Sequence, residues 1–267
     1  MTSKALSAYI AGISVLGPGL ADWTSAATVL AGHGGYVSVP AVLPAPTALP
    51  AAERRRTGRV VKLAIAVGLA AASRAAIEPK SLLTVFTSSA GDGDNCHEIC
   101  QTLASPERQL SPTRFHNSVH NAPAGYWSIA TGAMTGSTTL CAFDGSFSAG
   151  LLEAVVQVLT QPHPVLLVAY DCDYPQPLAQ TRPIAAPLGI GLVLTQARSE
   201  CSIARLTIGL GPGIPDILEN PQLELLRTGV PAGRGLPLLS MIARQQSGKL
   251  ILDYHAGTML HTEVQIC

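Results

Sequence analysis

Two serines stand where a strand is predicted to turn into a helix. Ser146 and Ser148 lie between an apolar strand predicted over 138–143 and an Ala- and Leu-rich helix predicted over 149–160. A hydroxyl at a tight strand-to-helix turn is the arrangement in which serine acts as a nucleophile, provided that a base and an acid lie nearby. The segment 146–150, Ser-Phe-Ser-Ala-Gly, is a loose variant of the Gly-x-Ser-x-Gly elbow in which the first glycine is replaced.

Possible partners for such a serine follow in the order serine, acid, histidine. Asp171 or Asp173 comes after the next predicted strand, and His255 or His261 stands near the end of the chain. No histidine-glycine segment that would form an oxyanion hole precedes the elbow. A serine hydrolase that uses Ser148 is therefore kept as an alternative.

The cysteines predict free thiols. Six are scattered along the chain. Cys96 and Cys100 are four residues apart and can share a helix face, but no second pair completes a zinc site. Cys141 lies inside the predicted strand and is expected to be a core residue. We therefore expect no metal ion and no cofactor, and scattered free thiols are typical of a reducing, cytoplasmic compartment.

The composition indicates a layered globular protein. Of 267 residues, 47% are apolar, 13% are charged and only 4% are aromatic. Abundant Ala and Gly allow elements to approach closely, which favours α/β layers. A formal net charge of zero argues against a nucleic-acid partner held by bulk electrostatics. The apolar stretch near the N-terminus is broken by Gly12, Gly17 and Pro18, so we expect neither a signal peptide nor a membrane span.

The pattern of apolar residues predicts alternating strands and helices up to about residue 170. The predicted strands are 8–16, 82–87, 138–143 and 165–170, and the predicted helices are 22–30, 54–76, 94–103, 119–131 and 149–160. This order indicates right-handed crossovers and a parallel sheet that is buried on both faces. Beyond it we expect an antiparallel pair (189–195 with 201–208), two helices (216–228 and 236–245) and a closing hairpin (249–254 with 259–265).

Four motifs in consistent order resemble β-ketoacyl synthases. Residues 121–132, Asn-Ala-Pro-Ala-Gly-Tyr-Trp-Ser-Ile-Ala-Thr-Gly, resemble the Asn-x-x-Ala-Gly-x-x-Ser-Ile-x-x-Gly helix of that family. In the family this helix precedes a buried strand and the turn that presents the catalytic cysteine. Residues 9–19 resemble its first strand and glycine turn, 86–93 a small-residue turn, and 181–194 its Arg-Pro-Phe segment with the following strand. The likeness spans roughly residues 8–210.

The resemblance implies a thiolase-like (ketosynthase) layered α/β fold in a single domain over residues 1–267. Its N-terminal half, 1–210, would be largely complete, and its C-terminal half would be truncated to short helices and a hairpin over 211–267. The glycines over 209–213, near the start of the first helix of that tail, match no phosphate-binding fingerprint. We expect Gly125, in the helix over 119–131, to be needed for close packing.

The resemblance also places the family's nucleophile at Gly145 or Ser146, with Phe147 as the outer limit, and none of these residues is a cysteine. Thioester chemistry needs a thiolate, and the family's two catalytic histidines come from the C-terminal half. His255-Ala256-Gly257-Thr258 is similar to the family's His-Gly-Thr-Gly-Thr segment. Only nine residues follow it, so we interpret it as a hairpin turn. The resemblance therefore implies a chain that is not an enzyme.

A ketosynthase-like chain without the cysteine resembles the chain length factors of type II polyketide systems. The short length and the run over 146–154 resemble, more narrowly, the factors of aryl-polyene pathways. Such a factor forms a heterodimer with a catalytic β-ketoacyl synthase and helps to shape its acyl tunnel, and the system uses an acyl carrier protein. The strand over 138–143 would then lie at the twofold axis. A homodimeric thiolase-like scaffold without a role in chain length stays open as a further alternative.

The resemblance suggests two groups of site residues. The carrier-docking candidates are Arg54, Arg55 and Arg56, which are expected at a helix start where positive charge opposes the helix dipole. The tunnel or interface candidates are Phe115, His116, Asn117, His120, Asn121, Phe143 and Asp144. Capping of the helix over 119–131 by Asn117 or Ser118 would explain part of the second group.

Overall fold

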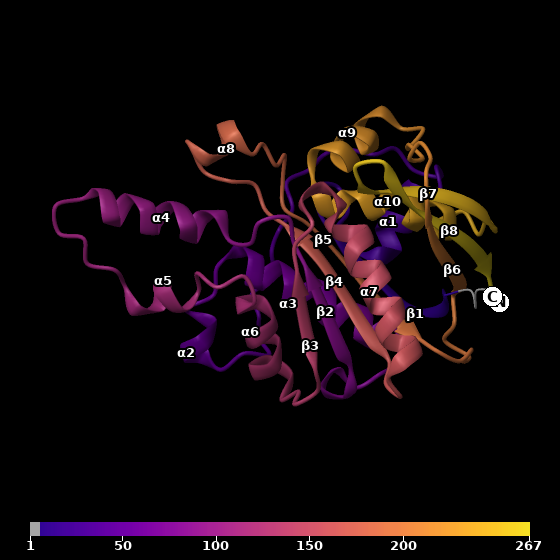
Figure 1. The fold of residues 1–267 in the computed structure, drawn as a ribbon, viewed down its shortest axis with the longest axis horizontal. Helices are drawn as coiled ribbons and strands as arrows, with labels where there is room; N and C mark the ends of the chain where they lie inside the picture. Colours follow the sequence, from indigo (N-terminus) through magenta and orange to yellow (C-terminus); the bar gives the residue numbers. More distant parts are fainter. Residues whose placement is uncertain (1–5) are drawn as a thin grey trace.

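The computed structural model describes residues 6–267, whose strands form one mixed sheet in the order β3-β2-β4-β5-β1-β6-β8-β7 (Figure 1). The strands are β1 (Leu6–Leu16), β2 (Leu83–Thr87), β3 (Ser137–Leu140), β4 (Val165–Asp171), β5 (Leu188–Thr195), β6 (Ala204–Gly211), β7 (Gly248–His255) and β8 (Thr258–Ile266). The α-helices are α1 (Trp23–Leu30), α2 (Ala51–Arg54), α3 (Arg59–Arg74), α4 (Gly93–Ala104), α5 (Pro112–His116), α6 (Ala122–Thr131), α7 (Ser146–Thr160), α8 (Leu178–Thr181), α9 (Pro221–Gly229) and α10 (Leu236–Ala243). Three 3-10 turns are η1 (Pro79–Ser81), η2 (Phe143–Gly145) and η3 (Pro231–Gly235).

The sheet is parallel only at one end. Strand β2 pairs in parallel with β3 and β4, whereas the remaining neighbours are antiparallel. The predicted pairing of 189–195 with 201–208 is wrong, because β1 lies between these two strands. The N-terminal part of β1 pairs with β6 and its longer C-terminal part pairs with β5. The predicted closing hairpin is confirmed as β7 and β8.

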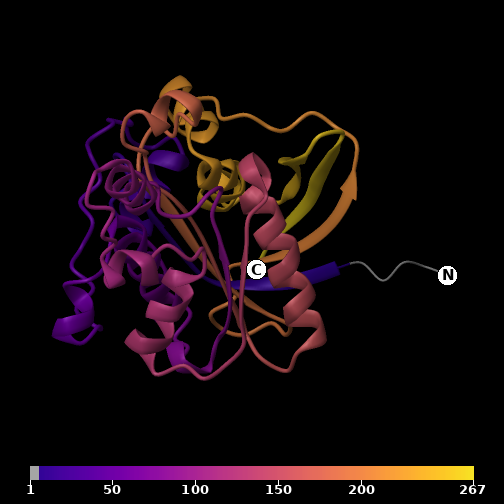
Figure 2. The same cartoon turned by 60° about the vertical axis from the view of Figure 1, so that its left-hand side comes forward.

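Helices cover both faces of the sheet, as the layered prediction requires. Helices α3 and α6 pack on one face, and α1, α7 and α10 pack on the other (Figures 1 and 2). Strand β4 is buried at every position because it lies between the two helix layers. Gly68 of α3 allows α6 to approach, since a Cβ there would lie 2.7 Å from the indole of Trp127. A Cβ on Gly125 of α6 would have no atom within 4 Å, so the predicted packing role of this glycine is wrong.

The long helix predicted over 54–76 is divided. Helix α2 ends at Arg54, and α3 begins after Gly58, whose extended backbone forms its N-cap. Arg54, Arg55 and Arg56 therefore lie at the end of α2 and in the turn after it. The predicted position of these arginines at the start of the long helix is therefore wrong, because they precede the N-cap of α3.

Two further expectations near β3 are wrong. The strand ends at Leu140, so Phe143 belongs to the turn η2 and not to the strand. Cys141 follows the strand and is exposed instead of lying in the core, and its thiol donates to the carbonyl of Ser89. Over residues 6–267, no helix combines the length and the apolar character needed to cross a membrane.

Candidate functional site

The turn between β3 and α7 has a strained residue at its apex. Phe143 has a φ of 53°, in the left-handed region that bulky side chains avoid. Strained backbone at a strand-to-helix turn is the geometry that presents a nucleophile in elbow-type sites. Gly145 ends η2 and Ser146 begins α7, both with negative φ values. The geometry thus favours Phe143 as the presented residue, two positions before Gly145.

The two serines of the turn are buried in its structure. Ser146 is 1% exposed, and its hydroxyl donates to the carbonyl of Phe143 at 2.7 Å and accepts from the N–H of Ala142 at 3.0 Å. This hydroxyl serves to hold the turn. Ser148 is fully buried, and within the described part of the chain its hydroxyl has no hydrogen-bond partner.

The residues considered as the acid and the base for Ser148 either form hydrogen bonds with other groups or are exposed. His261 has its Nε2 2.8 Å from the carbonyl oxygen of Pro212, and His255 is exposed at the end of β7. Asp171 accepts hydrogen bonds from Ser89 and from the N–H of Ala232. No described hydrogen bond links Ser148 to any of these groups.

The C-terminal segment closes over the inner side of the turn. A Cβ on Gly145 would overlap the backbone carbonyl of Tyr254 in β7, and a Cβ on Gly235 in η3 would overlap the ring of Phe147. Gly257, with a φ of 79°, forms the tight turn between β7 and β8. The segment from His255 is therefore a hairpin turn, as predicted.

Arg182 connects the outer side of the turn to a distant segment. Its guanidinium carbon lies 3.6 Å from the centroid of the Phe143 ring, and its Nη2 donates to Asp144 at 2.7 Å. Phe143 as a whole stays 61% exposed. Three residues, from η2 and from the segment that follows α8, thus form one cluster.

The predicted tunnel or interface residues at the end of α5 differ in exposure: one is buried and two are exposed. Asn117 is buried, donates to the carbonyl of Arg56 at 2.8 Å and accepts from the Tyr126 hydroxyl at 3.1 Å. It braces the arginine-bearing turn against α6. Phe115 is 68% exposed and His116 is also exposed, on a segment that projects from the sheet (Figure 1).

The remaining two candidates of this group lie at the start of α6. Burial lowers the pKa of His120, whose Nε2 is buried without a hydrogen-bond partner among the described residues. Asn121 is exposed and occupies the N-cap of α6 without a side-chain capping bond. The predicted capping by Asn117 or Ser118 is therefore wrong.

A polar cleft of about 440 Å³ lies between the α2–α3 turn, α4 and α5. Arg55, Arg56 and Arg114 contribute positive charge to its walls, and Asp92 and Asp94 contribute negative charge. Two of the arginines are paired with carboxylates outside the cleft, at 3.1 Å for Arg56 and 3.2 Å for Arg114. Desolvation by burial raises the pKa of Asp92. Arg55 and Arg56 are both exposed.

A family model described as the β-ketoacyl synthase N-terminal domain matches residues 31–210, more than half of the chain. The chain belongs to the β-ketoacyl synthase family. The matched region includes β3, η2 and α7, so the turn at Phe143 is part of the family's N-terminal domain. A search of curated protein sequences finds no match.

Solved structures of this family have the same fold. A chain of the complex between the ketosynthase ApeO and its chain length factor ApeC from Xenorhabdus doucetiae gives a TM-score of 0.73 at 21% identity, with 96% of this chain and 99% of that chain covered. The AntDE:AntF complex, a type II polyketide synthase acyl carrier protein with its ketosynthase, gives 0.74 at 10% identity, with coverage of 98% and 99%. A β-ketoacyl synthase from Burkholderia phymatum STM815 gives 0.60 at 13% identity, with coverage of 90% and 71%. The thiolase-like ketosynthase fold is confirmed.

Two features of this ketosynthase-family chain were not predicted from its sequence. Arg182 was noted only as part of a motif, and nothing local indicated that it contacts Phe143. Asp171 was considered only as a hydrolase acid, whereas it is a fully buried carboxylate whose desolvation raises its pKa to about 6. A polar residue directly after an apolar strand was the only signal for it.

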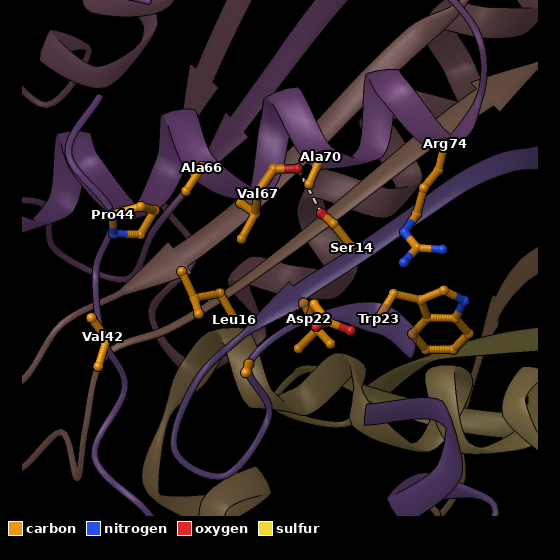
Figure 3. A pocket seen from close by; sticks show the side chains of 12 residues that line it. Ser14, Leu16, Asp22, Trp23, Val42, Pro44, Ala66, Val67, Ala70 and Arg74 are labelled. Carbon is orange, nitrogen blue, oxygen red and sulfur yellow. Dashed lines mark hydrogen bonds between the residues drawn. The ribbon is translucent and has the colours of Figure 1, made fainter. Parts of the chain in front are cut away.

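An apolar cavity of about 360 Å³ lies elsewhere, between β1, α3 and the segment around Val42 and Pro44 (Figure 3). Leu16, Val42 and Ala66 form part of its walls, and Arg74 stands at one end. None of the predicted site residues lines it. Within residues 6–267 there is also no cluster of three or more metal-ligating side chains.

Proposed function

We propose that this chain is a chain length factor: a catalytically silent subunit that pairs with an active β-ketoacyl synthase and helps to shape its acyl tunnel. The biosynthesis would be of the polyketide, aryl-polyene or fatty-acid-like kind. The observation that supports this most directly is the residue at the apex of the β3–α7 turn. In this ketosynthase-family chain it is Phe143, whose ring can neither attack a thioester nor be a leaving group.

The surroundings of the turn support catalytic silence. The two hydroxyls near Phe143 belong to Ser146, which is bonded to the turn's own backbone, and to Ser148, which is fully buried. The inner side of the turn is packed against β7 and η3. Neither serine oxygen is open to a substrate carbonyl, because Ser146 is 1% exposed and Ser148 is fully buried.

The open edge of β3 supports pairing with a second subunit. Strand β3 is the terminal strand of the sheet, and it pairs with β2 along one of its two edges. The N–H groups of Thr84 and Ser88 donate to the carbonyls of Gly136, at 3.1 Å, and Leu140, at 3.4 Å. Because backbone groups alternate along a strand, the residues at 137 and 139 direct theirs to the open side. An unpaired edge offers N–H and C=O groups that a second chain can pair with, and the similar ApeO–ApeC structure is a ketosynthase in complex with its chain length factor.

Three exposed side chains with aromatic rings are our candidates for contacts with the partner's tunnel. Phe115, His116 and Phe143 are all exposed; Phe143 lies in the turn that follows β3, and the other two lie in α5. His120, Asn121 and Asp144 lie next to them in sequence and serve as interface candidates. Asn117 is better assigned as a structural brace because it is buried and has both amide groups paired.

Carrier docking is a further part of the proposal. Arg54, Arg55 and Arg56 lie beside a polar cleft, and acyl carrier proteins of such systems are acidic. The similar AntDE:AntF structure contains a type II polyketide synthase acyl carrier protein with its ketosynthase. Transient electrostatic docking would speed encounter without a large contact area.

A proline at Thr139 tests the paired edge. Thr139→Pro removes an N–H from the open side of β3 and leaves the bonds to β2 intact, and proline is tolerated at such edge positions. Thr139→Ala is the matched control, since it removes the side chain and keeps the N–H. We expect the proline variant to keep its fold by circular dichroism but to lose affinity for the ketosynthase, whereas the alanine variant binds normally. Equal binding by both variants would contradict pairing through this edge.

A further inference from the structure

The side chain of Arg182 makes two different contacts at the turn. Its flat face lies 3.6 Å from the ring centroid of Phe143, and its edge donates to Asp144 at 2.7 Å. We propose that Arg182 is a positioning residue that fixes the orientation of the Phe143 ring and thereby sets where the partner's acyl tunnel ends. This inference rests on the proposed function and deepens it.

The backbone conformation of Phe143 is unfavourable, so contacts of its ring must stabilise it. The backbone of this residue is in the left-handed region, at φ 53°, which is costly for an aromatic residue. The residue is 61% exposed, so burial in the core does not offset that cost. Contact with the guanidinium is the described interaction that fixes the ring from outside.

Asp144 in turn fixes the guanidinium. Phe143 and Asp144, which are adjacent in η2, thus contact the face and the edge of the Arg182 guanidinium. The Arg182 side chain is only 18% exposed. A planar guanidinium can stack and donate in its plane at the same time, whereas an ammonium group cannot. The geometry is therefore specific for arginine and not merely for a positive charge.

One hydrogen-bond donor of the Arg182 guanidinium is unpaired among the described residues. This donor is Nε, which is buried and has no acceptor within residues 6–267. Buried donors are normally paired, but among the described residues the guanidinium is held only by its contacts with Phe143 and Asp144.

The test uses the reconstituted ketosynthase heterodimer and measures the length distribution of its products by mass spectrometry. Arg182→Lys keeps the charge but loses the flat stacking surface. We expect it to bind the ketosynthase normally and to raise the share of longer products on the order of threefold, because an ammonium group cannot keep the bond to Asp144 and cover the ring at the same time. Phe143→Ala should shift the products in the same direction, and Phe143→Tyr, which keeps the ring, should not. Arg205→Lys, at an exposed position in β6, is the control.

The double variant Arg182→Lys/Phe143→Ala should have the same products as Phe143→Ala alone, because the arginine acts through the ring. Additive shifts, or wild-type products from Arg182→Lys, would overturn the inference while leaving the heterodimer intact. If Arg182→Lys does not fold, Asp144→Asn, which weakens the hold on the guanidinium, gives the same comparison. Failure of the wild-type chain to pair at all would instead refute the proposed function, and this inference with it.

Discussion

Gly145 lies directly beneath the backbone carbonyl of Tyr254, with no room for a side chain between them. Gly145 ends the turn η2, and Tyr254 belongs to the C-terminal strand β7. The backbone of Gly145 has a φ of −84°, which any residue can adopt, so the requirement for glycine here is steric. The turn at Phe143 and the C-terminal hairpin are therefore one packed unit.

Gly145→Ala should destabilise the chain strongly. A methyl group would overlap a backbone atom that cannot rotate away, and overpacking of this kind costs about 1–3 kcal/mol or more. Urea unfolding followed by the fluorescence of Trp23 and Trp127 measures the change. The control is Gly125→Ala in α6, where no atom lies within 4 Å and alanine should be neutral or stabilising by up to about 1 kcal/mol. Equal effects of the two substitutions would contradict the packed turn.

The isolated chain should be chemically silent. Neither acyl carrier protein loaded with an acyl group nor a fluorophosphonate probe should label it, because Phe143 occupies the apex and both nearby serines are buried. Intact-protein mass spectrometry checks this. Stoichiometric modification at Ser146 or Ser148 would show that the chain is an active enzyme after all.

The arginines beside the polar cleft should contribute to carrier binding. Replacing Arg54, Arg55 and Arg56 with alanine should weaken binding of an acidic carrier protein to the heterodimer and reduce its dependence on salt concentration. A matched variant removes three exposed cations elsewhere, at Arg198, Arg205 and Lys249, and changes the net charge equally. If both triple variants lose the same affinity, only the total charge matters and the local docking site is wrong.

Asp171 should make stability depend on pH in an unusual direction. Burial raises its pKa from the ordinary value of 3.8 to about 6, although Ser89 and Ala232 donate to it. The folded state therefore binds the proton more tightly than the unfolded state. Its stabilising contribution is complete below about pH 4 and is lost as pH rises through about 6.

The comparison of wild type with Asp171→Asn isolates this contribution. Between pH 4 and pH 7 the wild type should lose on the order of 3 kcal/mol of unfolding free energy relative to the variant. Urea unfolding at a series of pH values measures it. Parallel curves for the two proteins, or a wild type that gains stability over this range, would show that the carboxylate does not have the raised pKa.

Local patterns in the sequence were sufficient for most elements of the fold. Apolar runs such as 165–170 and the closing hairpin were located to within a residue or two, because burial imposes those patterns directly. The order of strands was harder to predict. The insertion of β1 between β5 and β6 depends on which edges meet in three dimensions, and sequence spacing favoured the two neighbours in the chain.

The candidate site was predictable only as a region. The strand, turn and helix around residues 138–160 were predicted from the sequence, but the family resemblance placed the nucleophile position at Gly145 or Ser146, with Phe147 as the outer limit. The strained residue is Phe143, which no propensity would select. Its contact with Arg182 joins segments 39 positions apart in the sequence, and no local pattern of residues connects them.

We expect this chain to pair with a catalytic ketosynthase through the open edge of β3. Obligate interfaces of this kind usually bury more than roughly 2,000 Å², so the chain should self-associate or be poorly soluble alone. The direct measurement is native mass spectrometry after co-expression with a cysteine-bearing ketosynthase from the same organism. We predict a one-to-one heterodimer as the main species. A well-behaved monomer, with no affinity for any ketosynthase offered to it, would contradict the claim.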